Sequence, residues 1–498
     1  MVIAFETTND LDFMPCLDSF ARKSAEETFR KTYPVFETTS LLDDLRRTEY
    51  ARLDEQEQVY LDYTGGGLYA QSQVEEHLQV LSRKVFGNPH STNPTSQAMT
   101  TMVEQTRHIV LKYFNASPDE YVVIISANAT TVIKLVGESY PFAPGGRYML
   151  TSDNHNSVNG IREFARAKGA LFTYVPIELP DLRVNGTQLL WALDQALPGR
   201  QNLFAYPAQS NFSGVQHPLE WIDEAHARGW DVLVDCAAFA PTNRMDLSRW
   251  HPDFVPLSFY KIFGYPTGAG CLLERKDALT KLRRPWYAGG TVLFASVLAA
   301  QSPGAGFYLK AEQEGFEDGT LNYLTIPAVE IGLKHIERIG MECIHERVQC
   351  FTDWLLKNLL SLRHSNGRPV VHVYGPVTTE RRGGTIAFNF ADPHGMLFDC
   401  YAAQEEANHW GISSRSGCFC NPGAREIALS YDREELAACL REKEHLSTEQ
   451  FLQIIDGRLK QGALRVSVGL VTNFADVFHF TQFARNFVDR AVYSSRAA

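Results

Sequence analysis

The sequence predicts an α/β protein in which a large domain with a mainly parallel, helix-covered sheet is followed by a smaller α+β domain. Between residues 121 and 274, short apolar segments show no polar alternation, which is typical of strands buried on both faces of a sheet. Helical patterns such as residues 218–229 lie between these segments, and this alternation favours parallel pairing. The alternation stops after about residue 328, which indicates a second domain.

Seven segments are expected to form the strands of the large sheet: 121–126, 147–152, 171–175, 202–206, 231–235, 254–259 and 270–274. Ligands of open α/β sheets bind beyond the carboxyl ends of the strands. Side chains at the ends of the strands 231–235 and 254–259 are therefore candidates for a binding site.

The rest of the chain follows other patterns. A long helix is expected from about residue 328 to residue 362, and a charged, helical, solvated insertion is expected at 432–451. The remaining expected elements are an amphipathic helix at 18–34 ended by Pro34, strands of a smaller sheet at 370–374, 383–390 and 463–469, and a final amphipathic helix at 474–492. We therefore expect an N-terminal segment that packs with the small domain (1–70), a large α/β domain (71–330) and a small α+β domain (331–498).

Length, net charge and cysteine content limit the classes of protein that the sequence fits. A chain of 498 residues is too long for one compact core and predicts at least two domains. The net charge of −11 argues against a nucleic-acid or membrane-surface partner. Nine cysteines without regular spacing favour a reducing compartment, and the N-terminus shows neither a signal peptide nor a membrane span. The expected location is the cytoplasm.

One lysine lies just beyond the carboxyl end of the predicted strand 254–259, in the segment SFYKIFGYPTGAG (258–270). A lysine there, Lys261, can form a Schiff base with an aldehyde cofactor, and the glycine-containing loop can approach a phosphate. Asp235 ends the strand 231–235. A carboxylate and a lysine in these positions are what pyridoxal phosphate (PLP) needs, because the carboxylate keeps the pyridine nitrogen protonated. Lys261 alone would be interpreted as a surface lysine, but the pair and its surrounding strands favour PLP.

Further motifs follow in a fixed order along the chain: YLDYTGGGLY (60–69), FGNPHSTNPTS (86–96), NHNSVNGIRE (154–163), PAQSNFSG (207–214), FEDGTLNYL (316–324), RSGCFCNPGA (415–424) and LRVSVG (464–469). Together with 258–270 they resemble class V aminotransferase-like PLP enzymes of fold type I. Within that class they resemble molybdenum cofactor sulfurases and, more distantly, cysteine desulfurases. The resemblance covers about residues 55–490.

The resemblance implies a set of cofactor-binding residues. His155 would stack on the cofactor ring and carry a proton, and Asn211 would contact cofactor or substrate. Ala129, Thr130 and Ser258 would bind the phosphate with a backbone amide and two hydroxyls. Ordinary structural roles remain open for these residues: a loop histidine, helix caps and a turn asparagine.

The resemblance also implies how sulfur and substrate are held. Arg415, Gly417 and Cys420 match the pattern that presents the sulfur-accepting cysteine in cysteine desulfurases, where a mobile loop thiolate takes sulfur as a persulfide. Cys418 is not expected to be the nucleophile. Arg465 resembles the arginine that binds the substrate carboxylate, together with Arg415 and Asn211. The alternatives are loop cysteines packed as small apolar groups or half of a metal site, for which no second pair exists; no metal is predicted.

Three residues depart from these families. Tyr260 replaces the histidine that precedes the lysine in ordinary desulfurases, and Ala238 replaces a glutamine that bonds the cofactor's phenolic oxygen there. Arg425 stands where the sulfurase motif usually has a third cysteine. Tyr260 agrees with the resemblance to the sulfurases, and Ala238 removes a hydrogen bond to the cofactor.

The resemblance further implies a homodimer with shared sites. Loops of one subunit reach the phosphate of the other in this fold family, and the segments 288–291 and 316–320 resemble those loops. Their hydroxyls, on Thr291 and Thr320, would bind the phosphate across the interface. Two ordinary glycine turns are the alternative.

The expected function is that of a PLP-dependent, cysteine desulfurase-like enzyme that acts on L-cysteine and passes sulfur to an acceptor protein or cofactor. One alternative keeps PLP but makes the chain a lyase, transaminase or epimerase that acts on another amino acid. Another alternative is a sulfur-relay or scaffold protein built on this fold.

Overall fold

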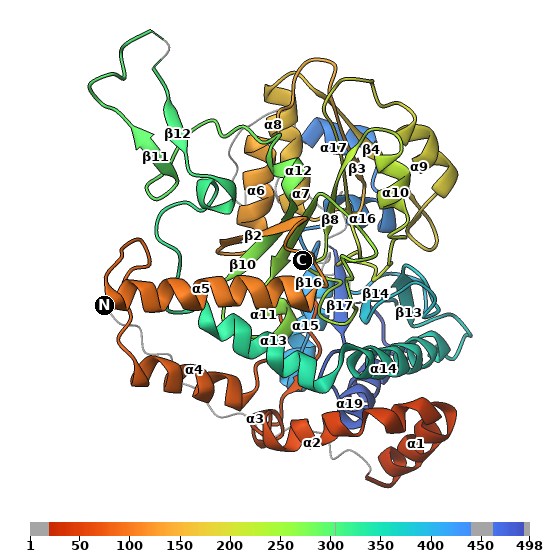
Figure 1. Cartoon of the computed structure of the whole chain (residues 1–498). Helices are drawn as coiled ribbons and strands as arrows, with labels where there is room; N and C mark the ends of the chain where they lie inside the picture. The colour runs from red at the N-terminus through yellow and green to blue at the C-terminus, as the bar shows by residue number, and fades with distance from the viewer. Residues whose placement is uncertain (1–18, 304, 440–461, 493–498) are drawn as a thin grey trace, which may run out of the picture.

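A computed structural model describes residues 19–303, 305–439 and 462–492 (Figure 1). Its centre is a seven-stranded sheet, which in spatial order comprises β2 (Tyr121–Ser126), β10 (Gly270–Arg275), β9 (Phe254–Ser258), β8 (Asp231–Asp235), β7 (Asn202–Pro207), β3 (Arg147–Thr151) and β4 (Leu171–Val175). All seven predicted strands are present, and the fold class is confirmed.

Strand β10 alone runs antiparallel to its neighbours in this sheet. The connection from β9 to β10 holds only the short helix α11 (Phe259–Phe263) and a turn. A parallel return needs a crossover of a dozen or more residues, so this short connection reverses the chain instead.

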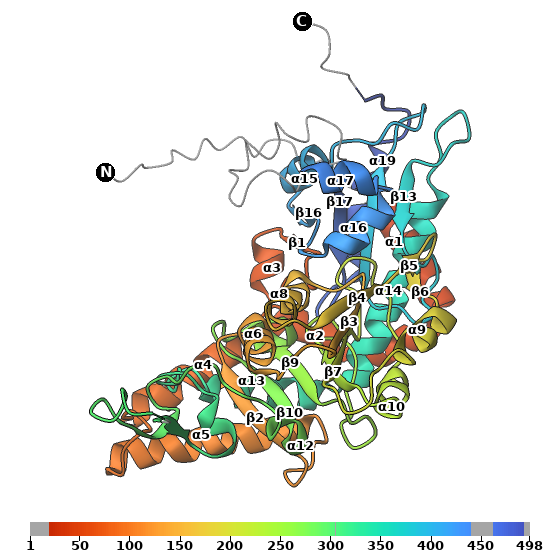
Figure 2. The same cartoon turned by 90° about the horizontal axis from the view of Figure 1, so that it is seen from above.

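Helices cover both faces of the sheet (Figures 1 and 2). Along β2, Val122 and Ile124 join the core under α6 (Ala129–Ser139) and α8 (Ile161–Ala167), whereas Val123 and Ile125 join the core under α5 (Pro94–Tyr113) and α13 (Pro327–Ile339). This alternation explains why the strands contain so few polar residues. The edge strand β4 differs, because Leu171 is 61% exposed.

The C-terminal part forms a four-stranded antiparallel sheet in the order β13 (Val371–Tyr374), β14 (Thr385–Phe390), β17 (Ala463–Ser467) and β16 (Arg415–Gly417). It packs on α14 (Met341–Ser361), α15 (Cys400–His409) and α19 (Phe474–Arg485). The single long helix expected after residue 328 is wrong: α13 and α14 are separate helices. They meet at Gly340, whose φ of 88° is in the region that favours glycine.

The N-terminal helices lie against the C-terminal part (Figures 1 and 2). The ring of Phe29 in α1 (Ser19–Thr32) stacks on that of Phe351, with centroids 5.3 Å apart. Arg46 in α2 (Leu41–Thr48) forms a buried ion pair with Asp476, with 3.0 Å between nitrogen and oxygen. Strand β1 (Val59–Tyr60) pairs in parallel with β15 (Ile412–Ser413). The boundaries proposed for the three parts of the chain remain a prediction.

The remaining elements are short or peripheral: η1 (Pro34–Thr39), α3 (Arg52–Glu55), α4 (Gln71–Arg83), α7 (Asn156–Asn159), β5 (Ile177–Glu178), β6 (Arg183–Val184), α9 (Gly186–Leu193), α10 (Trp221–His226), α12 (Lys276–Leu279), β11 (Val292–Ala295), β12 (Phe307–Leu309), η2 (Glu312–Gly315), α16 (Pro422–Ala428) and α17 (Arg433–Cys439). Helix α17 begins the predicted insertion, whose residues 440–451 lie outside the described part of the chain. Within that part, no helix is long and apolar enough to span a bilayer.

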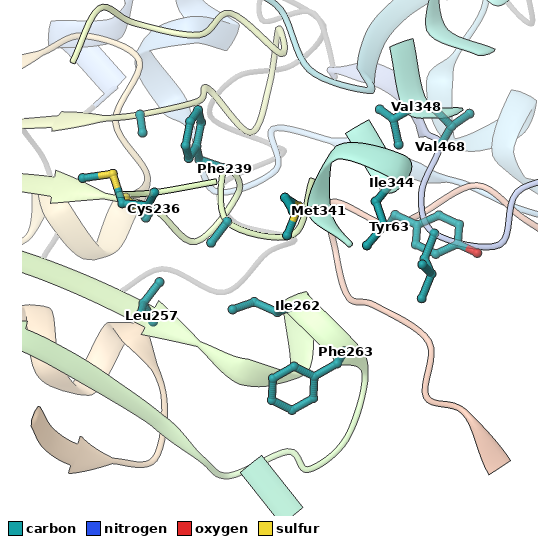
Figure 3. Close-up of a cluster of buried hydrophobic side chains, with 14 of the residues drawn as sticks. Tyr63, Cys236, Phe239, Leu257, Ile262, Phe263, Met341, Ile344, Val348 and Val468 are labelled. Carbon is teal, nitrogen blue, oxygen red and sulfur yellow. The ribbon is translucent and has the colours of Figure 1, made fainter. Parts of the chain in front are cut away.

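A hydrophobic core continues from the large sheet into the C-terminal part (Figure 3). Ile262 and Phe263 of α11 lie in it together with Met341 and Ile344 of α14. A Cβ at Gly332 of α13 would lie 2.1 Å from the Phe263 ring, so the glycine lets α13 approach this helix closely. Helix α11 is therefore held by its apolar side chains.

Glu274 in β10 is fully buried, and neither of its carboxyl oxygens has a hydrogen-bond partner. Burial, and secondarily the negative charge of Asp253, raises the pKa of Glu274 well above its usual value of 4.5. The folded protein therefore retains a proton that the unfolded chain loses. Its stability should fall by about 1.4 kcal/mol per pH unit as the pH rises above 4.5, until the folded pKa is reached.

We expect Glu274→Gln to remove this pH dependence. Urea denaturation at pH 5, 6 and 7 should show the variant gaining stability relative to wild type at each step, because the amide has no proton to lose. The exposed Glu55→Gln is the matched control and should follow wild type. A constant difference between Glu274→Gln and wild type would contradict the protonated carboxyl.

Candidate active site

Lys261 lies in α11, directly after β9, and lines a pocket of about 210 Å³ at the carboxyl ends of the strands. The following turn needs Gly264, whose φ is 80° and whose added Cβ would lie 2.3 Å from the Leu68 backbone. Gly67 N–H donates to the carbonyl of Tyr260 at 3.0 Å. The glycines of the 60–69 motif therefore pass tightly against the lysine helix.

Burial lowers the pKa of the Lys261 ammonium; Asp235 opposes this effect, and the charges of Arg465 and Arg415 add to it. A lowered pKa makes the neutral amine more abundant. The neutral amine is the form that attacks an aldehyde, so the site favours covalent attachment of an aldehyde cofactor.

Asp235 and His155 line the same pocket as Lys261. Asp235 is buried at the end of β8, and one of its oxygens accepts a hydrogen bond from the Ala237 N–H at 2.9 Å. His155 caps α7 by accepting from the Ser157 N–H at 3.1 Å through Nδ1. Burial lowers the pKa of His155, although Asp235 opposes this, which favours a neutral ring at pH 7.

The pocket also contains a helix N-terminus with several hydroxyls. Ala129 begins α6, and its N–H donates to Ser258 Oγ at 2.9 Å. Thr130 Oγ1 lies 2.7 Å from the hydroxyl of Ser157, a residue that the sequence analysis missed. The helix dipole and the hydroxyls favour an anion here, although the Ala129 and Thr131 amides already donate to Ser258 and Asn128. A Cβ at Gly270 would lie 2.7 Å from Asn128 Cα, so this glycine keeps the helix start close to β10.

These residues fit pyridoxal phosphate. A buried carboxylate, a lysine with lowered pKa and an anion-binding helix start surround one pocket, as a flat pyridine aldehyde with a phosphate requires. Among the residues that the structure describes, no group of three or more histidine, cysteine or acidic side chains could hold a metal.

The carboxylate of Asp62, which was not predicted from the sequence, binds Arg465 and Arg415, two of the residues predicted to bind the substrate. Asp62 Oδ1 accepts from Arg465 Nη2 at 2.9 Å, and Oδ2 accepts from Arg415 Nη2 at 2.6 Å. Arg465 is 2% exposed, and its Nε has no hydrogen-bond partner. A buried arginine in an apolar strand requires a partner, so the sequence did indicate that Arg465 has one. It could not show that the partner is Asp62, which lies 403 residues earlier in the chain.

The cysteine loop lies against the pocket. Cys420 is exposed, with a φ of 55°, and its carbonyl accepts from Asn156 N–H at 2.7 Å. Asn211 Nδ2 donates to the Phe419 carbonyl at 2.7 Å. The loop is therefore anchored on both sides of its exposed thiol, although the sequence analysis treated it as mobile. Cys418 is only partly exposed.

The two threonines that were predicted to bind the phosphate, Thr291 and Thr320, do not line the Lys261 pocket of their own chain. Thr291 is buried and bonds to Ala288, and Thr320 is exposed. Their loops are adjacent, because Gly319 N–H donates to the Gly289 carbonyl at 2.8 Å.

Two ion pairs hold the second of these loops, one of them buried and the other with an exposed carboxylate. Glu317 forms two hydrogen bonds with Arg107 of α5, at 2.6 and 2.7 Å, and Asp318 pairs with Arg284. The two acidic residues of the FEDGT motif therefore have a structural role: their ion pairs hold the loop that carries Thr320 at the surface.

This fold and this pocket define a pyridoxal-phosphate enzyme of fold type I. The chain belongs to the aminotransferase class-V family, whose model matches residues 59–480.

Comparison with known proteins agrees with this assignment. The chain is 36% identical to a molybdenum cofactor sulfurase of Solanum lycopersicum over 94% of its own length and 60% of that protein. It is 34% identical to the Homo sapiens protein of that name, covering 91% of this chain and 52% of that one. The chain thus spans about half to three fifths of the length of these curated relatives.

Solved structures share the fold. A cysteine desulfurase from Thermococcus onnurineus NA1 superposes with a TM-score of 0.70 at 22% identity, covering 90% of this chain and 98% of that one. The cystine C–S lyase C-DES, solved with its product cysteine persulfide, gives 0.62 at 18% identity, covering 86% and 98%.

Proposed function

We propose that this chain is a cysteine desulfurase-like enzyme that removes sulfur from L-cysteine and holds it as a persulfide on Cys420. The observation that carries this proposal is the exposed Cys420, on a loop that is hydrogen-bonded to the pocket residue Asn211 and to Asn156, which lies between the pocket residues His155 and Ser157. The similarity to molybdenum cofactor sulfurases supports it.

Each pocket residue has a role in this proposal. Asp235 would pair with the ring nitrogen, Lys261 would hold the cofactor covalently, His155 would lie against its ring, and Ala129, Thr130 and Ser258 would bind its phosphate. The cofactor supplies an electron sink for charge on the substrate α-carbon. Lys261 or His155 moves the α-proton, because both have pKa values lowered by burial.

Substrate binding and sulfur transfer fall to the C-terminal residues. Arg465 Nε has no hydrogen-bond partner and would bind the substrate carboxylate, together with Asn211 and Arg415. The Cys420 thiolate then attacks the substrate sulfur. A sulfur–sulfur bond forms, the carbon–sulfur bond breaks with its electron pair moving to carbon, and protonation of that carbon gives alanine.

Mass spectrometry tests this proposal directly. After incubation with L-cysteine, the peptide that contains Cys420 should gain one sulfur atom, and alanine should form. Cys420→Ser should lose the added sulfur and most alanine formation, whereas the matched variant Cys418→Ser should retain both. Pyruvate and sulfide as the products, with full activity in Cys420→Ser, would instead indicate a C–S lyase.

We also propose that the working unit is a homodimer in which Thr291 and Thr320 of one subunit bind the phosphate of the other. The hairpin β11–β12 extends from the body of the chain (Figure 1). Its exposed residues include several large apolar ones. These are Leu293, Phe294, Val297, Leu298 and Tyr308, of which Leu298 is 99% exposed. Such a surface favours a protein partner.

A charge at the shared site should weaken association and cofactor binding together, because each depends on the other. We expect Thr320→Asp to lower the dimer fraction in sedimentation and to raise the dissociation constant for PLP by about 10-fold or more. Thr187→Asp, an exposed control, should change neither. A monomer with full PLP occupancy and activity would contradict the shared site.

The proposal includes a sulfur acceptor and a cellular location. An exposed persulfide on Cys420 is open to a sulfur-acceptor protein or cofactor. The cysteines whose side chains the structure describes are all free thiols, which supports a cytoplasmic location.

A further inference from the structure

One side of the cofactor pocket lacks the donor that ordinary desulfurases place there. Ala238 lines the pocket three residues after Asp235, and its methyl group cannot donate a hydrogen bond. In PLP, the phosphate arm and the ring oxygen flank the aldehyde carbon on opposite sides. In a pocket that binds the phosphate on one side, a donor to the ring oxygen would therefore lie on the other side.

The order of the strands shows which side that is. Strand β8, with Asp235, lies between β9 and β7. Ser258, at the predicted phosphate side, ends β9, so the ring oxygen of the cofactor would face the segment that follows β7. The first polar side chain of that segment is Gln209, which lines the pocket together with Lys261 and Ala238.

The amide of Gln209 is oriented by its neighbours. Its Oε1 accepts from Gln216 Nε2 at 3.0 Å and from Asn243 Nδ2 at 3.4 Å. Gly383 leaves room for it, because a Cβ there would lie 2.0 Å from the same oxygen. Two donors to the oxygen assign the other amide atom as the nitrogen. That nitrogen donates to no group in the described part of the chain, although the side chain is only 3% exposed.

We propose that Gln209 Nε2 donates a hydrogen bond to the ring oxygen of PLP, and so supplies from β7 the contact that Ala238 cannot supply from β8. A donor at this oxygen stabilises its negative charge. It thereby makes the nitrogen that links Lys261 to the cofactor less basic. The proposal rests on the cofactor and not on the desulfurase reaction.

The absorption spectrum of the bound cofactor tests this without substrate. The band changes with the protonation of the linking nitrogen, so a pH titration gives a midpoint. We expect Gln209→Leu to raise this midpoint by about one pH unit, and Gln209→Glu to raise it at least as much, because the acid keeps the accepting oxygen but loses the donor. Gln209→Leu combined with Ala238→Gln should return the midpoint toward wild type.

Gln216→Leu is the matched control, since it removes one bond to Oε1 and leaves the Gln209 nitrogen in place. It should lower the thermal midpoint of the protein and shift the spectral midpoint less than Gln209→Leu does, because Asn243 still donates to Gln209 Oε1. An unshifted midpoint in both Gln209 variants would overturn the proposal, as would an equal shift in Gln216→Leu. Wild-type protein without any cofactor band would overturn the cofactor itself.

Discussion

Lys261→Ala should lack the absorption band of the covalently held cofactor and lose nearly all turnover. Lys261 is the lysine in the pocket with Asp235, and burial has already lowered its pKa. Without it, the chain loses both the covalent link and one proton carrier. Loss of proton transfer alone typically costs about 10²–10⁴-fold in rate. Spectroscopy of the purified variant, together with assay of alanine formation, measures both effects.

The exposed lysine Lys84 supplies the control for this experiment. Lys84→Ala should purify with the wild-type band and turnover. If Lys261→Ala also kept wild-type turnover, the assignment of the cofactor-bearing lysine would be wrong.

The second large effect is expected at Asp62. Asp62→Ala leaves Arg465 buried without its carboxylate and removes the partner of Arg415. Removing one member of a buried ion pair typically costs about 3–5 kcal/mol. Most of that loss should come from Arg465, since the Arg415 side chain is 50% exposed and water can solvate it. Urea denaturation of the variant measures the loss.

Two further variants sharpen this test. Adding Arg465→Met to Asp62→Ala should recover part of the lost stability, because the unpaired buried charge is gone. Asp44→Ala breaks an exposed pair with Arg47 and should cost at most about 1 kcal/mol. A loss at Asp62 as small as that at Asp44 would contradict the role assigned to this carboxylate.

The sequence predicted the large sheet well because its strands are buried on both faces and form apolar segments in order along the chain. The same logic explains why Asp235, Ser258 and Lys261 were predicted to lie together, as they do in one pocket. They stand at strand ends, and the ends of parallel strands meet at one edge of a sheet. The break between α13 and α14 was missed because a single glycine, Gly340, does not by itself interrupt a helical pattern.

The parts of the site that the sequence could not provide depend on contacts between distant segments. Asp62 is not at the end of a large-sheet strand, and its arginines lie in the C-terminal sheet. The hydrogen bond from Asn211 to Phe419 likewise joins residues 208 positions apart. No local pattern encodes such pairs. The place of Thr291 and Thr320 in a partner's site stays a prediction, which the proposed dimer experiment addresses.

The pairing of Asp62 with Arg465 also bears on how the enzyme is made. These two residues are separated by 403 positions in a chain of 498. A ribosome produces the chain from its N-terminus, and the large sheet can form as soon as its strands have emerged. During that time the carboxylate of Asp62 has no arginine from β17 to bind. The pair of Asp62 and Arg465 therefore forms only after β17 has been translated, when the lysine and the anion-binding helix are already available.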